Sequence, residues 1–315
     1  MPTPDSSQVS LCQSAGFQQA TIVAHEPIAE ATWRLRVDCP AIATAALPGQ
    51  FAMLRIPNRQ DPLLARPLAV YDVFADLVDP TSWRPPAAAG SQPAPTDRRY
   101  ADFVYAVAGK FTTSATALRP GDAISLWGPL GNGFQRPVTD HLVLVAGGIG
   151  QTALLMLGRD LLAHSPTSRV TFCWGARHGG LFGHVEDFRA AGLDVHLATL
   201  DGSLGTQGTV IDLLDRLEAD GNLARREEET TTIACCGPEK MMAAVSRWAT
   251  TRGLTCQVSL ETPMACGIGI CFTCVAAVRD EDGSWDYRRT CLEGPVFEAN
   301  SLEWHPEKTT VAAGP

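Results

Sequence analysis

Four cysteines near the C-terminus constrain this chain more than any other feature. They are Cys266, Cys271, Cys274 and Cys291, and the first three follow a C-x4-C-x2-C spacing. That spacing, with a distant fourth cysteine, is the plant-type pattern for a [2Fe–2S] cluster. Gly267 lies inside the loop, where a residue without a Cβ lets the backbone turn its amides toward the sulfurs. The pattern predicts a cluster held by four thiolates, which moves one electron at a time.

Zinc and disulfides are the alternative interpretations of these cysteines. Structural zinc sites usually pair two short C-x2-C knuckles or use histidine, whereas here three cysteines lie on one side without a nearby histidine. Disulfides need an oxidising compartment, and the N-terminal 17 residues have neither the basic nor the apolar region of a secretory signal. We therefore favour the cluster, and we expect a cytoplasmic protein. The remaining six cysteines are scattered, and we expect small buried apolar side chains at Cys12, Cys39, Cys173, Cys235, Cys236 and Cys256.

Length and charge limit the class of protein. A chain of 315 residues has room for two domains and a small additional module. The net charge of −9 argues against a nucleic-acid partner, which would require a basic face. The longest apolar stretch, 142–158, is interrupted by glycines and is too short to span a bilayer.

Residues 16–138 contain short β-rich segments separated by Pro and Gly, which is typical of a small antiparallel barrel. Within them, residues 79–100 are so rich in Pro and Ala that we expect an inserted surface loop between two strands. The expected strands are 17–26, 32–39, 49–57, 66–74, 102–109 and 122–129.

Between residues 139 and 254 strands and helices alternate, which predicts a parallel sheet with helices on both faces. Such sheets bind ligands at the carboxyl ends of their strands. The expected strands are 141–148, 169–177, 194–200 and 231–237, and the expected helices are 149–164, 181–192, 210–219 and 238–253. The remaining boundaries that we expect are a loose tail at 1–15, a cluster module at 255–300 and a second tail at 301–315.

Two turns follow strands of this parallel sheet. Residues 146–150 form a glycine-rich turn, which lets backbone amides and a helix N-terminus approach a pyrophosphate, although glycine turns also serve simple packing. Residues 235–242 end a strand and begin a helix, and the simpler interpretation is an ordinary turn with Pro at the first helical position. The candidate nucleotide-binding residues are Gly147, Gly148, Gly150, Cys236, Gly237 and Pro238.

Taken in order, these pieces resemble the ferredoxin–NADP reductase superfamily, and within it the electron-transfer subunits of NAD-dependent dihydroorotate dehydrogenases. The resemblance covers roughly residues 16–300. It rests on Arg66-Pro67-Leu68-Ala69-Val70, WGPLGNGF at 127–134, AGGIG at 146–150, WGAR at 174–177, DGSLGTQGTVIDLL at 201–214, CGPEKMM at 236–242 and the cysteine segment.

The resemblance implies an antiparallel FAD-binding β-barrel, then a parallel-sheet NAD-binding α/β domain, then a small [2Fe–2S] module. It implies FAD contacts from Arg66, Pro67, Leu68, Ala69, Gly109, Thr112 and Thr113, and a cysteine near the nicotinamide at Cys236. We find no motif for acid–base chemistry on a substrate, so a partner chain must act on orotate. In relatives that partner carries FMN.

The implied function is electron transfer in pyrimidine biosynthesis, from the FMN subunit through [2Fe–2S] and FAD to NAD⁺, in an assembly of two copies of each chain. The alternative is an NAD(P)H-dependent flavin and iron–sulfur reductase subunit that serves ferredoxin or a hydrogenase-type partner. The segment 267–272 and Phe297 should form the interface with the partner.

Two positions depart from the family pattern. Ala69 replaces a serine that faces the flavin, which removes a side-chain hydrogen bond. Phe111 replaces a small residue of the second flavin element, so that it must either point away from the site or narrow it.

Overall fold

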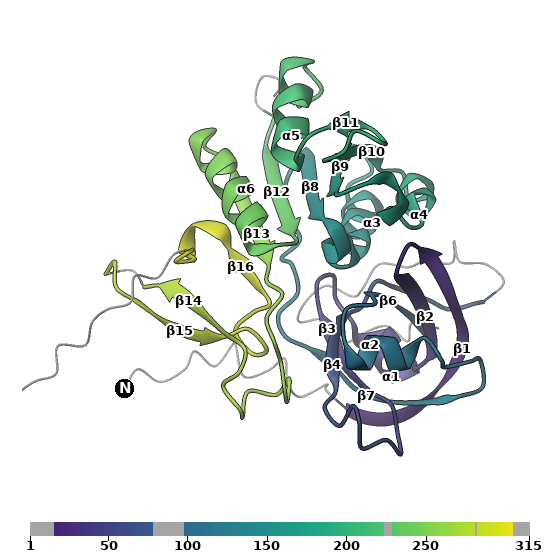
Figure 1. Cartoon of the computed structure of the whole chain (residues 1–315). Coiled ribbons are helices and arrows are strands. Elements are labelled where there is room, and N and C mark those ends of the chain that lie inside the picture. Colours follow the sequence, from purple (N-terminus) through teal and green to yellow (C-terminus); the bar gives the residue numbers. More distant parts are fainter. Residues whose placement is uncertain (1–15, 78–97, 224–228, 281, 305–315) are drawn as a thin grey trace, which may run out of the picture.

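The computed structural model describes residues 16–77, 98–223, 229–280 and 282–304, which form two sheets and a small hairpin (Figure 1). The expected tail at 1–15 and residues 79–97 of the expected loop lie outside this part of the chain. No helix among the described residues is long and apolar enough to cross a membrane.

The first sheet is antiparallel, has the order β4-β3-β7-β1-β2-β6-β5, and curves into a barrel (Figure 1). Two short helices, α1 (Pro40–Ala45) and α2 (Lys110–Ala115), accompany it. The expected strand 66–74 is divided into two strands at Val70 and Tyr71. The Val70 amide donates to the Gln50 carbonyl, whereas the Tyr71 amide donates to the Asp102 carbonyl of a different strand. The strands are β1 (Gly16–Ala29), β2 (Thr32–Asp38), β3 (Phe51–Arg55), β4 (Arg66–Ala69), β5 (Asp72–Phe74), β6 (Tyr100–Ala106) and β7 (Ala123–Leu130).

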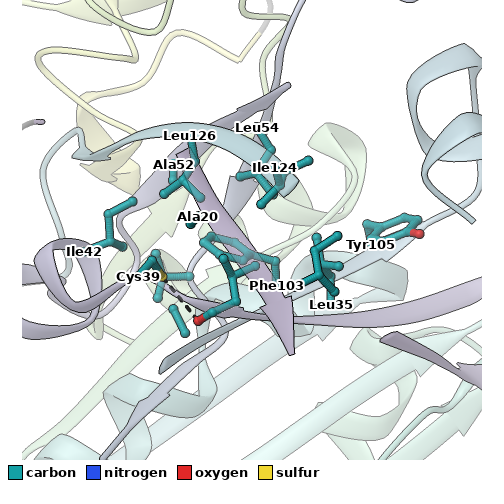
Figure 2. Close-up of a cluster of buried hydrophobic side chains, with 14 of the residues drawn as sticks. Ala20, Leu35, Cys39, Ile42, Ala52, Leu54, Phe103, Tyr105, Ile124 and Leu126 are labelled. Carbon is teal, nitrogen blue, oxygen red and sulfur yellow. Dashed lines mark hydrogen bonds between the residues drawn. The ribbon is translucent and has the colours of Figure 1, made fainter. Parts of the chain in front are cut away.

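Alternate residues of these strands fill the barrel. Leu35 and Val37 of β2 and Ile124 and Leu126 of β7 point inward, as a period of two requires (Figure 2). Cys39 is also buried in this core, where its thiol donates to the Val37 carbonyl at 3.5 Å. Strands β5 and β6 are antiparallel neighbours, so the expected loop joins adjacent strands. Its last residue, Tyr100, already belongs to β6.

The second sheet has the order β11-β10-β9-β8-β12-β13-β16, and all its pairs are parallel except the last. Every residue of β8 is buried, because helices cover both faces of the sheet. Its strands are β8 (His141–Gly147), β9 (Arg169–Ala176), β10 (Asp194–Thr199), β11 (Thr206–Gln207), β12 (Thr231–Cys236), β13 (Thr255–Ser259) and β16 (Val296–Glu298). Its helices are the 3-10 helices η2 (Gly148–Ala153) and η3 (Gly179–Leu181), and α3 (Leu155–His164), α4 (Val185–Ala190), α5 (Val210–Ala219) and α6 (Glu239–Thr251).

The C-terminal module is less separate than we expected. Strand β13 pairs with β12 and β16, so a boundary at 254/255 cuts through the sheet. The module's own sheet is the antiparallel hairpin of β14 (Val275–Arg279) and β15 (Trp285–Arg289), followed by η4 (Ala299–Ser301). Leu302 is buried and bridges to Val278, so residues 301–304 belong to the fold and not to a tail.

Ion pairs and a hydrogen bond join the barrel to the nucleotide domain. The Tyr71 hydroxyl donates to Asp187 of α4 at 2.9 Å, and Arg159 of α3 pairs with the buried Asp72. Asp187 also lies 3.8 Å from Arg34 of β2. Buried charges must be paired to be tolerated, so these contacts fix the relative position of the two domains and of any cavity between them.

Candidate functional site

The glycine-rich turn after β8 borders a cavity of 450 Å³ at the carboxyl ends of β8, β9 and β10. Three of the candidate nucleotide-binding residues, Gly147, Gly148 and Pro238, line it. Gly148 has a φ of +53°, and a Cβ there would meet no atom within 4 Å, so the backbone is open toward the cavity. The lining also includes Trp174 and Arg177 of the WGAR segment.

The other glycines of the two turns serve packing. A Cβ on Gly150 would lie 2.3 Å from the Cys236 carbonyl oxygen, and one on Gly237 would lie 2.9 Å from the Gly147 amide nitrogen. Neither glycine lines the 450 Å³ cavity. Their role in the structure is to bring the turns after β8 and β12 into contact.

The flavin motif borders a second cavity, of 270 Å³, between the barrel and the parallel sheet. Pro67, Leu68 and Ala69 of β4 line it, together with Thr112 of α2. Its remaining walls are largely apolar, which suits a planar aromatic ring system. Cys236 also lines this cavity and does not line the first one.

The remaining residues predicted to contact FAD lie outside the lining of the flavin cavity. The Arg66 guanidinium donates to the carbonyls of Leu64 and Ala65, at 3.3 and 3.0 Å, and has no ion pair with a carboxylate among the described residues. Gly109 is the N-cap of α2, and its amide donates to the Thr112 hydroxyl at 3.0 Å. Thr113 lies one residue further along α2, with its amide bonded to the Gly109 carbonyl.

Phe111 points away from the flavin cavity. Its ring is buried in the barrel core, at 3% exposure, and does not line the cavity. The phenylalanine at position 111 therefore fills the barrel core and does not narrow the flavin cavity. Of the two expectations for Phe111, the one in which its side chain points away from the site is correct.

The two cavities adjoin, because Ala106 and Ile149 line both of them. Sequence reasoning missed the opposite wall of the flavin cavity, which Ser259, Glu261 and Thr262 form. Ser259 is the last residue of β13, and Glu261 and Thr262 come shortly after it. Their position at the carboxyl end of a parallel strand is the sequence signal that could have identified them.

The structure brings the four predicted cluster cysteines together in two pairs. The Cys266 thiol lies beside that of Cys271, and the Cys274 thiol beside that of Cys291, close enough for each pair to interact electrostatically. Within the described chain, no three His, Cys, Asp or Glu side chains converge as they would on a single metal ion. A [2Fe–2S] cluster would take two thiolates for each of its irons. Two thiol pairs fit that chemistry better than they fit one tetrahedral zinc ion.

The two pairs differ in their surroundings, and we call Cys266 and Cys271 the outer pair and Cys274 and Cys291 the inner pair. Cys271 is exposed, and hydrogen bonds from Thr273 lower the pKa of its thiol to about 6. Cys274 and Cys291 are buried, and burial raises the pKa of Cys291 to about 12. Cys271 is therefore ready to ligate iron as a thiolate, whereas the metal must displace a proton from Cys291.

Close packing holds the loop that carries the first three cysteines. Gly267 and Gly269 have φ values of +73° and +80°, and a Cβ on Gly269 would lie 2.3 Å from Leu292. The Trp127 indole donates to the Cys266 carbonyl at 3.1 Å, and Arg289 donates to the Gly269 carbonyl at 2.9 Å. The loop is thus fixed to both the barrel and the hairpin.

A small apolar group connects the cluster loop to the flavin cavity. Phe51 and Met264 pack with Cys274 and Cys291 in one buried group, and both also line the flavin cavity. The inner thiol pair and the predicted flavin site therefore share apolar neighbours.

Comparison with known proteins agrees with this arrangement. The family model "Iron-sulfur cluster binding domain of dihydroorotate dehydrogenase B" matches residues 261–303. The electron transfer subunit of dihydroorotate dehydrogenase B (NAD(+)) from Desulforamulus reducens is 32% identical over 286 residues, which span 90% of this chain and 97% of that protein. The corresponding subunit of a Geobacillus species is 30% identical over 288 residues, or 90% and 98% of the two chains.

This chain belongs to the family of dihydroorotate dehydrogenase B electron transfer subunits. Among solved structures, an NADH-dependent reduced ferredoxin–NADP oxidoreductase superposes with a TM-score of 0.70 at 25% identity, covering 92% of this chain and 91% of the other. Phthalate dioxygenase reductase, at 18% identity and a TM-score of 0.52, covers 87% and 77% and shares the fold. The predicted fold class, a β-barrel followed by a nucleotide-binding sheet and an iron–sulfur module, is confirmed.

Replacing any one of the four cysteines by serine should remove most of the iron, because a hydroxyl is a poor substitute for a thiolate ligand. We expect this for Cys266, Cys271, Cys274 and Cys291, measured as iron per chain and as the EPR signal of the dithionite-reduced protein. Cys12→Ser is the control. Normal iron content in Cys291→Ser would contradict the assignment of the fourth ligand.

A matched pair of glycine substitutions tests the loop packing. Gly269→Ala should lower cluster retention about tenfold or more, since it adds a clash with Leu292 to the strain of a positive φ. Gly283→Ala, with a φ of +85° and nothing within 4 Å of its Cβ, carries the strain alone. Equal cluster loss on dialysis from both variants would show that strain, and not the close approach, is responsible.

Proposed function

We propose that this chain carries electrons from a dihydroorotate-oxidising partner subunit through a [2Fe–2S] cluster and FAD to NAD⁺, in pyrimidine biosynthesis. The observation that carries this proposal is the order of the three sites. The 450 Å³ cavity adjoins the 270 Å³ cavity, and that cavity adjoins the cysteine pairs through Phe51 and Met264. The order of the sites supports a linear relay between NAD⁺ and the cluster.

The chemistry of the cofactors requires a flavin in the middle position. A nicotinamide exchanges two electrons as a hydride and a cluster exchanges one, whereas a bound flavin accepts either. The protein holds the rings in place and excludes water. We assign the flavin ring to the 270 Å³ cavity and the nucleotide to the 450 Å³ cavity.

Arg66 is the residue that we assign to the FAD phosphates. Among the described residues its guanidinium hydrogen-bonds to the Leu64 and Ala65 carbonyls through Nη1, which leaves other donors for a bidentate phosphate contact. Gly148 opens the backbone toward the nucleotide. At Ala69, where a side-chain hydroxyl is missing, the peptide backbone of β4 is left to contact the ring edge.

The surface beside the outer cysteine pair is the predicted docking site for the partner. Ile268, Ile270 and Phe272 are exposed there, by 46, 74 and 65%, directly around Cys271. Apolar side chains of this size seldom remain in water without a binding role. Phe297, which we also expect at this interface, is half-buried and packs against the core of the nucleotide domain, beside Gly294.

We infer that the partner is an FMN-containing catalytic subunit, in a cytoplasmic assembly with two copies of each chain. Apart from the four predicted cluster cysteines, the five cysteines of the described residues are all free and buried, as in proteins of a reducing compartment.

Two substitutions test the division of the cofactors between the cavities. Arg66→Ala should weaken FAD retention about tenfold or more while NADH binding changes little, because a charge-assisted bidentate contact is lost. Gly148→Val should do the opposite, because its side chain would enter the nucleotide cavity. Flavin content after gel filtration and NADH titration by fluorescence measure the two effects. Loss of the same cofactor from both variants would contradict the division.

A charged residue in the docking surface tests the partner. Ile270→Asp should weaken recovery of a dihydroorotate dehydrogenase subunit from the native cell extract by an order of magnitude, while dye reduction by NADH is retained. Leu200→Asp, which alters an exposed leucine at the nucleotide cavity, is a control for partner binding. Recovery of a ferredoxin-dependent or hydrogenase-type partner would favour the alternative function.

A further inference from the structure

One glutamine in the wall of the nucleotide cavity has a side chain that the fold leaves unsatisfied. Gln151 belongs to η2, directly after the glycine-rich turn at 146–150, and lines the 450 Å³ cavity. Only 2% of this residue is exposed to solvent. Its Oε1 is enclosed and accepts no hydrogen bond within the part of the chain that the structure describes. A buried amide oxygen without a donor destabilises the fold, so a bound ligand is the expected source of that donor.

The position of Gln151 in η2 indicates which part of the nucleotide lies beside it. Ile149 lines both cavities, and Thr152 and Ala153 line the flavin cavity, so η2 runs along the junction of the two. A nicotinamide ring must lie against the flavin to exchange a hydride with it, so the ring belongs at this junction. This inference rests on the proposed assignment of flavin and nucleotide to the two cavities.

The other polar side chains of the lining have different roles. In the described chain three of them already form hydrogen bonds within the protein, namely Thr32, Trp174 and Thr209. Arg177 carries a positive charge, which suits the pyrophosphate. Gln151 is the remaining polar side chain of this lining, and it is a neutral group with both a donor and an acceptor.

We propose that Gln151 pairs with the carboxamide of the nicotinamide ring. Two amides pair reciprocally, because the N–H of each donates to the carbonyl of the other. Rotation about the last torsion of the glutamine side chain is soft and exchanges its oxygen and nitrogen, so either atom can be turned toward the cavity. The carboxamide projects from one side of the nicotinamide ring, so holding it fixes the rotation of the ring and the direction of its reacting carbon. Gln151 positions the ring and takes no part in the hydride transfer itself.

A nucleotide without the carboxamide N–H tests this pairing. Acetylpyridine adenine dinucleotide has a methyl ketone in place of the carboxamide, so it keeps the carbonyl and loses the donor. The wild-type protein, loaded with FAD and cluster, should bind NAD⁺ about tenfold more tightly than this analogue, because a site built to pair with an N–H rejects a ligand that lacks it. Both nucleotides and the protein are used in their oxidised forms, so that no electrons are exchanged, and binding is measured by calorimetry.

Gln151→Leu removes the amide and keeps an apolar side chain of similar size. This variant should bind NAD⁺ about tenfold more weakly than the wild type does, and it should bind NAD⁺ and the analogue equally. ADP-ribose, which lacks the nicotinamide ring, should bind equally to the wild type and to the variant. The flavin and cluster absorption spectra show that the variant is assembled.

Gln257→Leu is the matched control. Gln257 lies on β13, donates to Glu298 at 2.9 Å and lines neither cofactor cavity. Its removal should leave the preference for NAD⁺ over the analogue at the wild-type value.

Equal binding of NAD⁺ and the analogue by the wild type would overturn the proposed pairing, whether or not Gln151→Leu folds. Weaker binding of ADP-ribose by Gln151→Leu would place the glutamine against another part of the nucleotide and would also overturn it. A wild-type protein that prefers NAD⁺ over the analogue, but whose flavin NADH does not reduce, would overturn the proposed relay and leave the pairing of Gln151 with the carboxamide in place.

Discussion

The contact between the inner thiol pair and the flavin cavity is the constraint on which the remaining structure depends. Cys274 and Cys291 are buried against Phe51 and Met264, which are themselves walls of that cavity. Burial raises the pKa of Cys291, so an apo form holds this thiol uncharged in a small apolar core.

The barrel and the iron–sulfur module consequently act as one unit. Trp127 of β7 holds the Cys266 carbonyl, and a Cβ on Gly267 would lie 2.6 Å from Met53 of β3. The ion pairs of Asp72 with Arg159 and of Asp187 with Arg34 fix the nucleotide domain to the opposite side of the barrel. Each cofactor cavity is therefore formed by two domains, and the relay requires these domains to keep their relative positions.

The sequence allowed prediction of the parts of the site that depend on spacing. The four cysteines, the β4 motif and the two turns of the parallel sheet could be located because each follows a local chemical rule. The direction of Phe111 could not be predicted, because it depends on how the short helix α2 packs on the barrel. The packing role of Gly150 and Gly237 could not be predicted either. A glycine that faces a ligand and a glycine that faces a neighbouring turn have the same sequence pattern. The wall of Ser259, Glu261 and Thr262 was missed because the cavity that it closes is formed by segments that are distant in the sequence.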